Sequence, residues 1–237
     1  MVSQATLHAM HMSDGIVTAP TSVLFAVIAA AGIAVAVRRA HTELDERAVP
    51  LAGLVAAFVF AVQMVNFPVL PGVSGHLLGG ALAAILVGPA TGALCIAIVL
   101  VVQSLLFADG GVTALGTNIV NMALIGVVAG YTVAVVCVAV LTRSGRGVSV
   151  RRLGVISFLA AVIGTVCAAG GFLVQYAIGG AAGVGLSTVA GYLLGTHLVI
   201  GIGEGVITAA TVMAVARARP DLVYLMHGTR TTEPVPA

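Results

Sequence analysis

Few side chains in this sequence are suited to chemistry, and the histidines come first among them. His11 lies near the N-terminus, and His76 lies at the start of an apolar stretch. Imidazole nitrogens bind nickel, copper, zinc and cobalt, and square-planar nitrogen sets suit nickel(II) and copper(II). Because the two positions are far apart in the chain, the residues alone leave two interpretations open: a shared transition-metal site, or separate hydrogen bonds within the fold.

A second ionisable pair, His197 and Glu204, lies inside one apolar segment. Charged groups at membrane depth are costly and usually face a cavity or a partner. At positions i and i+7 of a helix the two side chains share a face but lie about 10 Å apart along the axis, too far for a direct hydrogen bond. The structural interpretation is interhelical hydrogen bonding. The functional alternatives are a membrane-embedded enzyme with an acid–base pair, or a carrier with a proton path through Glu204 and Asp109.

Further polar residues next to apolar segments are candidates to support a site. Asp14 and Gly15 form a turn pair, since Asp accepts backbone N–H bonds and Gly permits unusual backbone angles. Such a turn folds the N-terminus back onto the protein. Ser74 is expected to cap a helix that begins near His76. The amide side chains of the set are Gln63, Asn66, Asn118 and Asn121.

The composition defines the environment in which these residues must work. Hydrophobic residues make up 60% of the 237 residues and charged residues only 8%, against about 25% charged residues in an average soluble chain. A soluble surface cannot be built from this pool, and a net charge of +2 is too small to indicate nucleic-acid binding. The chain is therefore expected to be an integral membrane protein.

Apolar segments along the chain predict an all-α, polytopic bundle of about seven transmembrane helices. A spanning helix needs about 20 mostly apolar residues. The Gly88–Pro89 pair ends one segment, because proline cannot donate to the helical ladder and restricts the residue before it. The predicted segments are Thr21–Val37, Leu51–Asn66, Leu77–Val87, Gly92–Phe107, Thr117–Leu141, Leu153–Ile178 and Val189–Val215.

The arginines set the orientation. All ten basic residues are Arg, and they occur after the first segment, between the fifth and sixth, and after the seventh. With seven spans these three places fall on one side, which the positive-inside rule makes cytoplasmic. The N-terminus is then outside and the C-terminus inside. The expected organisation is an N-terminal extension (1–9), a single transmembrane domain (10–216) and a cytoplasmic tail (217–237).

Two sequence motifs are absent from the chain. The first residues lack the basic and apolar regions of a cleavable signal peptide. The sequence contains no G-x-x-x-x-G-K-[S/T] phosphate loop, so we expect no ATPase site in this chain, and any ATP-driven step must draw on a partner.

Four ordered stretches resemble one known family. They are MHMSDGIVTAP from Met10, the run Gln63–Leu94, the run Val102–Gly126, and HLVIGIGEGVIT over His197–Thr208. Each is similar to a signature of CbiM and NikM, the cobalt and nickel substrate-capture subunits of energy-coupling factor transporters. The similarity covers nearly the whole apolar part of the chain.

The resemblance implies a multi-pass protein of the cell inner (plasma) membrane that binds transported cobalt(II) or nickel(II), with no permanently bound cofactor. It implies supply of cobalamin synthesis or of nickel enzymes, and it does not separate the two metals. The implied partners are a transmembrane coupling subunit, cytoplasmic ATP-binding subunits and a small accessory membrane subunit.

The resemblance also implies a ligand set of four nitrogens. They are the α-amine of Met10, the backbone amide of His11, and the imidazoles of His11 and His76. Asp14 would hold the inserted N-terminal turn. The implied supporting residues are Gln63, Asn66, Ser74, Asn118 and Asn121, since metal-bound histidines donate their other N–H to an oriented acceptor.

One departure from the family pattern affects this site. The residues MVSQATLHA precede Met10, so an α-amine at Met10 requires translation to start there or the tail to be removed. We expect Met10 to be the true start. If the tail is retained, His8 becomes a substitute ligand.

Overall fold

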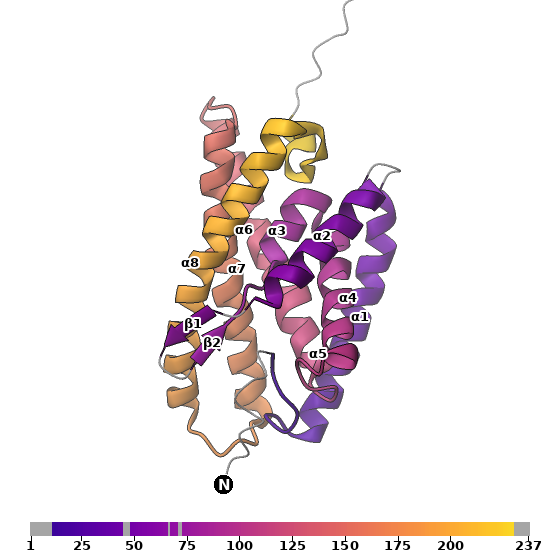
Figure 1. The fold of residues 1–237 in the computed structure, drawn as a ribbon, viewed down its shortest axis with the longest axis vertical. Helices are drawn as coiled ribbons and strands as arrows, with labels where there is room; N and C mark the ends of the chain where they lie inside the picture. The colour runs from indigo at the N-terminus through magenta and orange to yellow at the C-terminus, as the bar shows by residue number, and fades with distance from the viewer. Residues whose placement is uncertain (1–10, 45–47, 66, 71–72, 230–237) are drawn as a thin grey trace, which may run out of the picture.

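The computed structural model describes residues 11–44, 48–65, 67–70 and 73–229. Among these residues it forms a helical bundle with one short β-hairpin (Figure 1). The main helices are α1 (Ala19–Glu43), α2 (Ala48–Gln63), α3 (Gly80–Val87), α4 (Pro89–Leu106), α7 (Val150–Gly179) and α8 (Leu186–Ala218). Residues 115–143 form one continuous helix of three parts: α5 (Leu115–Asn118), the π-helical stretch η2 (Ile119–Gly126) and α6 (Val127–Arg143). Two 3₁₀ turns follow α8: η3 (Pro220–Leu222) and η4 (Tyr224–Thr229).

The prediction of a helical membrane bundle is confirmed. Each predicted apolar segment overlaps a helix of the described chain. Five helices, namely α1, α4, the 115–143 helix, α7 and α8, are long and apolar enough to cross a membrane. The helix α2 is shorter, and α3 has 8 residues, or about 12 Å. Because α2 and α3 are short, the count of seven spans stays a prediction.

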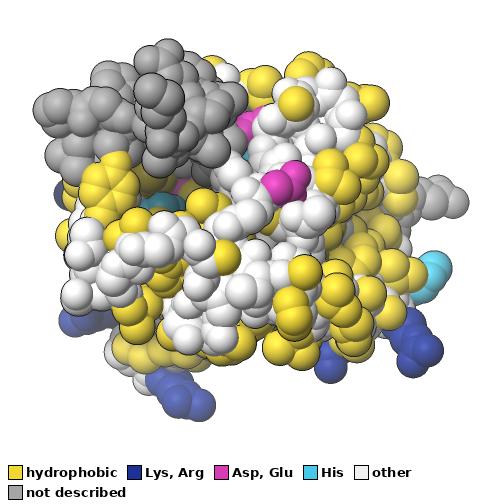
Figure 2. All heavy atoms as spheres, turned by 90° about the horizontal axis from the view of Figure 1, so that it is seen from below, with side chains coloured by type: hydrophobic (Ala, Val, Ile, Leu, Met, Phe, Trp, Pro, Cys, Tyr) yellow, Lys and Arg dark blue, Asp and Glu magenta, His cyan; other side chains and the backbone are white. Residues whose placement is uncertain are grey.

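Arginine-bearing helix ends gather at one end of the bundle. The C-terminal ends of α1, α6 and α8 lie together at the top of Figure 1, and α5 and the α7–α8 connection lie at the opposite end. In the view from below, acidic atoms lie near the middle of the face and arginine atoms only along its margin (Figure 2). The molecule is therefore electrostatically polarised along its long axis.

The helix α3 is the centre of the bundle. All eight of its residues are buried. Glycines let its neighbours approach closely, as is common among helices in lipid. A Cβ on Gly92 of α4 would lie 2.9 Å from the Ala84 backbone nitrogen, and one on Gly130 of α6 would lie 2.8 Å from the Ala81 Cβ. Large exposed side chains such as Val23, Leu105 and Ile202 lie on the outer surface, as expected for faces in contact with lipid.

The break at Gly88–Pro89 occurs where the sequence predicts it. Gly88 has φ 94°, a left-handed value that favours glycine, and Pro89 begins α4. The Glu43 carboxylate accepts hydrogen bonds from the backbone N–H groups of Ala90 (3.0 Å) and Thr91 (2.7 Å). A carboxylate at this position satisfies the unpaired donors of the first helical turn.

The prediction that Ser74 caps a helix beginning near His76 is wrong. Ser74 lies in strand β2 (Val73–Gly75), which pairs antiparallel with β1 (Phe67–Leu70). The next helix begins at Gly80, with Gly79 as its N-cap at φ 79° and no side-chain cap. Residues 76–79 therefore form a short non-helical connection, which we call the strap.

Candidate metal centre

The N-terminal segment folds back onto the bundle and is held there by Asn118 at the start of the long helix. The Met12 backbone N–H donates to Asn118 Oδ1 (3.0 Å), and Asn118 Nδ2 donates to the Met12 carbonyl (3.1 Å). The Gly111 N–H donates to the same carbonyl at 3.0 Å. Asn118 thus pairs with the Met12 main chain as a second strand would, and it fixes the residue that follows His11.

Asp14 attaches the N-terminal segment to the rest of the protein at a second point. Its Oδ1 accepts from the Thr113 backbone N–H (2.8 Å) and from the Thr113 hydroxyl (2.5 Å). The hydrogen bond from the Thr113 hydroxyl, helped by backbone N–H groups, holds the pKa of Asp14 below its ordinary value, although burial opposes the shift. Gly15 follows at φ 81°, so the chain turns here toward α1.

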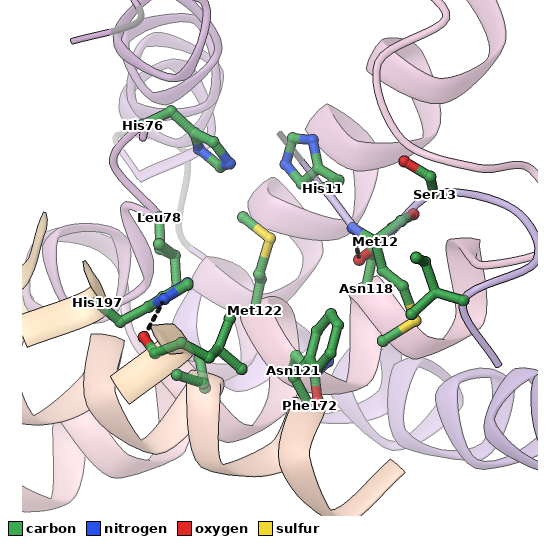
Figure 3. Close-up of a pocket in the computed structure, with 14 residues that line it drawn as sticks. His11, Met12, Ser13, His76, Leu78, Asn118, Asn121, Met122, Phe172 and His197 are labelled. Carbon is green, nitrogen blue, oxygen red and sulfur yellow. Dashed lines mark hydrogen bonds between the residues drawn. The ribbon is translucent and has the colours of Figure 1, made fainter. Parts of the chain in front are cut away.

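Two imidazole rings face each other at the inner end of this segment. The ring centroids of His11 and His76 lie 4.5 Å apart with an interplanar angle of 44° (Figure 3). Each residue is only 6% exposed. His11 Nδ1 lies 3.3 Å from Asp109 Oδ1, but both His11 ring nitrogens are buried without a hydrogen-bond partner among the described residues. Buried polar atoms left unsatisfied are costly, which favours a bound ligand at this ring.

The orientation of the second ring fixes its tautomer. His76 Nδ1 lies 2.8 Å from the Leu77 carbonyl oxygen. A carbonyl only accepts hydrogen bonds, so Nδ1 carries the proton and the lone pair is on Nε2. A backbone hydrogen bond on one ring nitrogen is the usual way in which proteins orient the other toward a metal.

Of the amide residues predicted as supports, two line the pocket, one supports the strap, and one lies outside the described residues. Asn118 and Asn121 both line the pocket. The Asn121 amide donates to Gln175 Oε1 (2.8 Å), and Gln175 donates to the Thr117 carbonyl (3.3 Å).

Gln63 donates to the Leu78 carbonyl at 2.7 Å and so supports the strap. Asn66 and Met10 lie outside the described residues. Gln175 was not among the residues predicted from the sequence, although an amide within an apolar segment is a usable signal.

His197 and Glu204 belong to different contacts, although both are on α8. His197 Nδ1 lies 2.8 Å from the Leu193 carbonyl oxygen, and its ring lines the pocket on the side away from His11 (Figure 3). The Glu204 carboxylate instead accepts from the backbone N–H groups of Leu78 and Gly79 and from the Thr165 hydroxyl. The acid–base pair of the enzyme alternative is not formed.

The pocket between these residues has room for an ion with small ligands. It has a volume of about 230 Å³ and is lined by both facing imidazoles, by the Met12 and Met122 side chains and by His197. Within the described part of the chain, no group of three or more His, Cys, Asp or Glu side chains is placed to hold a metal. Any metal held by the two imidazoles must therefore complete its coordination with other donors, such as backbone nitrogens.

The fold and this pocket define a class: a multi-pass helical membrane protein with a buried imidazole pair at one end of the bundle. The chain belongs to the CbiM family, described as the cobalt uptake substrate-specific transmembrane region, whose profile matches residues 11–222. It is thus a metal transport component, as the motifs indicate.

Individual relatives agree with this assignment. The chain is 38% identical over 214 residues to a provisionally named fused nickel transport protein, NikMN, of Archaeoglobus fulgidus, covering 90% of this chain and 68% of that one. It is 31% identical to the cobalt transport protein CbiM of Sorangium cellulosum, covering 93% and 97%. A crystal structure of a truncated transition metal transporter superposes with a TM-score of 0.73 at 27% identity, covering 88% of this chain and 99% of that one.

Proposed function

We propose that this chain is the metal-capture subunit of an ATP-driven energy-coupling factor importer for cobalt(II) or nickel(II). The observation that carries the proposal is the buried His11–His76 pair, with ring centroids 4.5 Å apart. Two imidazoles from distant parts of the chain meet in a pocket, and one of them has a buried nitrogen without a hydrogen-bond partner among the described residues. Imidazole nitrogen suits both metals.

The remaining ligands in this proposal are main-chain nitrogens. A chain that begins at Met10 offers an α-amine and the His11 amide beside the His11 ring, so three donors come from two consecutive residues. His76 supplies the fourth. The Asn118 contacts to the Met12 main chain support this arrangement, because they anchor the backbone directly after the chelating residues. Amine, amide and imidazole nitrogens must lose protons to bind, so affinity should rise with pH.

The proposed orientation places the metal pocket outside and the arginine-bearing helix ends in the cytoplasm of a plasma membrane. The positive-inside rule supports this direction. The sequence has no phosphate-binding loop of the Walker type, so ATP hydrolysis is assigned to partner subunits. A transmembrane coupling subunit, cytoplasmic ATP-binding subunits and a small accessory membrane subunit complete the proposed complex.

The experiment that tests the function is calorimetric titration of Ni²⁺ and Co²⁺ into purified protein. The full chain and a version that begins at Met10 are compared, each with His76→Ala and, as a matched control, with His41→Ala. His41 is exposed in the last turn of α1 and does not line the pocket. We expect tight binding by the Met10 version, loss of that binding in His76→Ala, and no change in His41→Ala.

Two other outcomes of the titration would change the proposal in different ways. Equal, His76-dependent binding by both versions would keep the imidazole pair and remove the α-amine from the ligand set. Tight binding that survives His76→Ala would overturn the proposed site.

A further inference from the structure

The strap that carries His76 is non-helical backbone inside the bundle. Residues 76–79 are buried and lie between strand β2 and helix α3. Backbone N–H and C=O groups at membrane depth must find partners within the protein, because no water is available in the hydrocarbon region. The groups that satisfy the strap therefore determine where its side chains point.

One carboxylate satisfies the N–H groups of the strap. Glu204, near the middle of α8 and 2% exposed, accepts from the Leu78 N–H through Oε2 (2.8 Å) and from the Gly79 N–H through Oε1 (3.0 Å). The Thr165 hydroxyl of α7 donates to Oε2 at 2.9 Å. All three contacts are donations to the carboxylate, and an acceptor-only group with two oxygens suits such a set.

The position of the contacts links Glu204 to the imidazole. Leu78 is two residues after His76, and its carbonyl is held from the other side by Gln63 at 2.7 Å. The carbonyl that orients the His76 ring belongs to Leu77, the residue between them. Glu204 itself does not line the pocket of the imidazole pair, so its effect on a metal has to pass through the strap.

We infer that Glu204 is a positioning residue for metal capture: it clamps the strap so that the His76 ring is presented to His11. This inference rests on the proposed function. Outer partners that orient a metal-bound histidine typically change metal affinity by about 10–100-fold when they are replaced. Glu204 would act in this way from one step further out, through backbone N–H groups.

The clamp also ties the pocket to the relative position of three helices. Glu204 is on α8, Thr165 on α7, and the strap leads directly into the N-terminus of α3. A displacement of α8 against α3 would break the two backbone contacts and release His76. Metal affinity would then depend on how the helices pack. A capture subunit needs such a dependence if it is to bind the metal on one side of the membrane and release it on the other.

The test compares four substitutions in the version that begins at Met10, which is expected to bind Ni²⁺ tightly: Glu204→Gln, Glu204→Ala, Thr165→Val and Ser157→Ala. Glutamine keeps the shape of the side chain, but its NH₂ group cannot accept a backbone N–H. Thr165→Val removes one contact and leaves the two backbone contacts. Ser157 is a buried residue of α7 with a hydroxyl that has no partner among the described residues, and it serves as the control for loss of a buried hydroxyl. Each variant is titrated with Ni²⁺ and its apparent melting temperature without metal is recorded.

We expect Glu204→Gln to weaken Ni²⁺ binding by about 10-fold or more and Thr165→Val by a smaller factor, with Ser157→Ala unchanged. The decisive readout is the absorption spectrum of bound Ni²⁺ at saturating metal. If Glu204 acts through His76, the spectrum of Glu204→Gln differs from that of the unsubstituted chain, because the orientation of an imidazole ligand has changed. A general loss of stability would instead lower the melting temperature and leave the spectrum the same in the two proteins.

The outcomes separate this inference from the proposed function. If His76→Ala leaves Ni²⁺ binding intact, the proposed site itself is wrong. If His76→Ala abolishes binding while Glu204→Gln and Thr165→Val bind like the unsubstituted chain, the site stands and the role of Glu204 is overturned. Should Glu204→Ala fail to fold, the glutamine and Thr165 variants still decide the question.

Discussion

The His11 and His76 rings meet with their centroids 4.5 Å apart, although neither residue is in a helix. One is carried by the N-terminal segment and the other by the strap. Each carrier is held through its main chain by a buried side chain, Asn118 for the first and Glu204 for the second. The pocket is thus built from two non-helical segments that side chains of the helical bundle hold in place.

Replacement of Asn118 by alanine should weaken Ni²⁺ binding by about 10-fold or more, because the Met12 main chain loses both amide contacts and the His11 ring is no longer fixed. Calorimetric titration measures the change. Thr132→Ala is the control, since Thr132 is exposed on α6 and bonds only to the carbonyl one turn earlier. An unchanged affinity in Asn118→Ala would show that the N-terminal segment finds its place without this clamp.

Docking of the N-terminal turn should weaken in acid. Asp14 has a lowered pKa in the folded protein because of the Thr113 hydrogen bonds. Its contribution is fully present above the ordinary pKa of an aspartate and is lost as the pH falls through the lowered value. Asp14 is largely exposed, so the effect is small. Amide hydrogen exchange over residues 111–118, corrected for intrinsic rates, measures it.

The control for this pH effect is Asp14→Asn, which keeps an acceptor oxygen and cannot titrate in this range. We expect protection in the unsubstituted chain to fall toward the asparagine level in acid, and the asparagine profile to stay flat. If protection depends on pH in the same way in the two proteins, Asp14 does not cause the pH dependence of docking.

Close packing at the centre of the bundle should make Gly92 intolerant of a side chain. Gly92→Ala places a Cβ against the Ala84 and Ala83 backbone, which cannot give way as a side-chain tip can. We expect a loss of about 1–3 kcal/mol in unfolding free energy. Gly170→Ala on α7 is the matched control, since nothing lies within 4 Å of its added Cβ; it should be neutral or stabilise by up to about 1 kcal/mol. Equal effects at the two glycines would contradict the packing described for α3 and α4.

Membrane orientation can be checked by single cysteines placed at the two ends of the bundle. Ser144 is exposed at the C-cap of α6 and Ser187 is exposed in the first turn of α8. In a background without native cysteines, an impermeant reagent added outside intact cells should label Ser187→Cys and leave Ser144→Cys unmodified. The reverse pattern would place the metal pocket on the cytoplasmic side and overturn the proposed direction of transport.

Much of the fold was accessible from the sequence because its signals are local. Apolar runs located every main helix, and Gly88–Pro89 located the break, since a proline and a positive-φ glycine act on their immediate neighbours. The expected helix start at Leu77 was wrong because the N–H groups of the strap are held by Glu204, which belongs to a helix distant in sequence.

Composition, arginine placement and four motifs determined by themselves that the chain is a helical membrane protein of a metal-transport family. They named His11 and His76 without showing that the rings meet. Only the tertiary structure decided that Asn118 holds Met12, that Glu204 clamps the strap while His197 faces the pocket, and that Gln175 supports Asn121. The physical reason is that helix formation in lipid depends on residues close in sequence, whereas a buried polar group takes whichever partner the packed bundle brings within hydrogen-bonding distance.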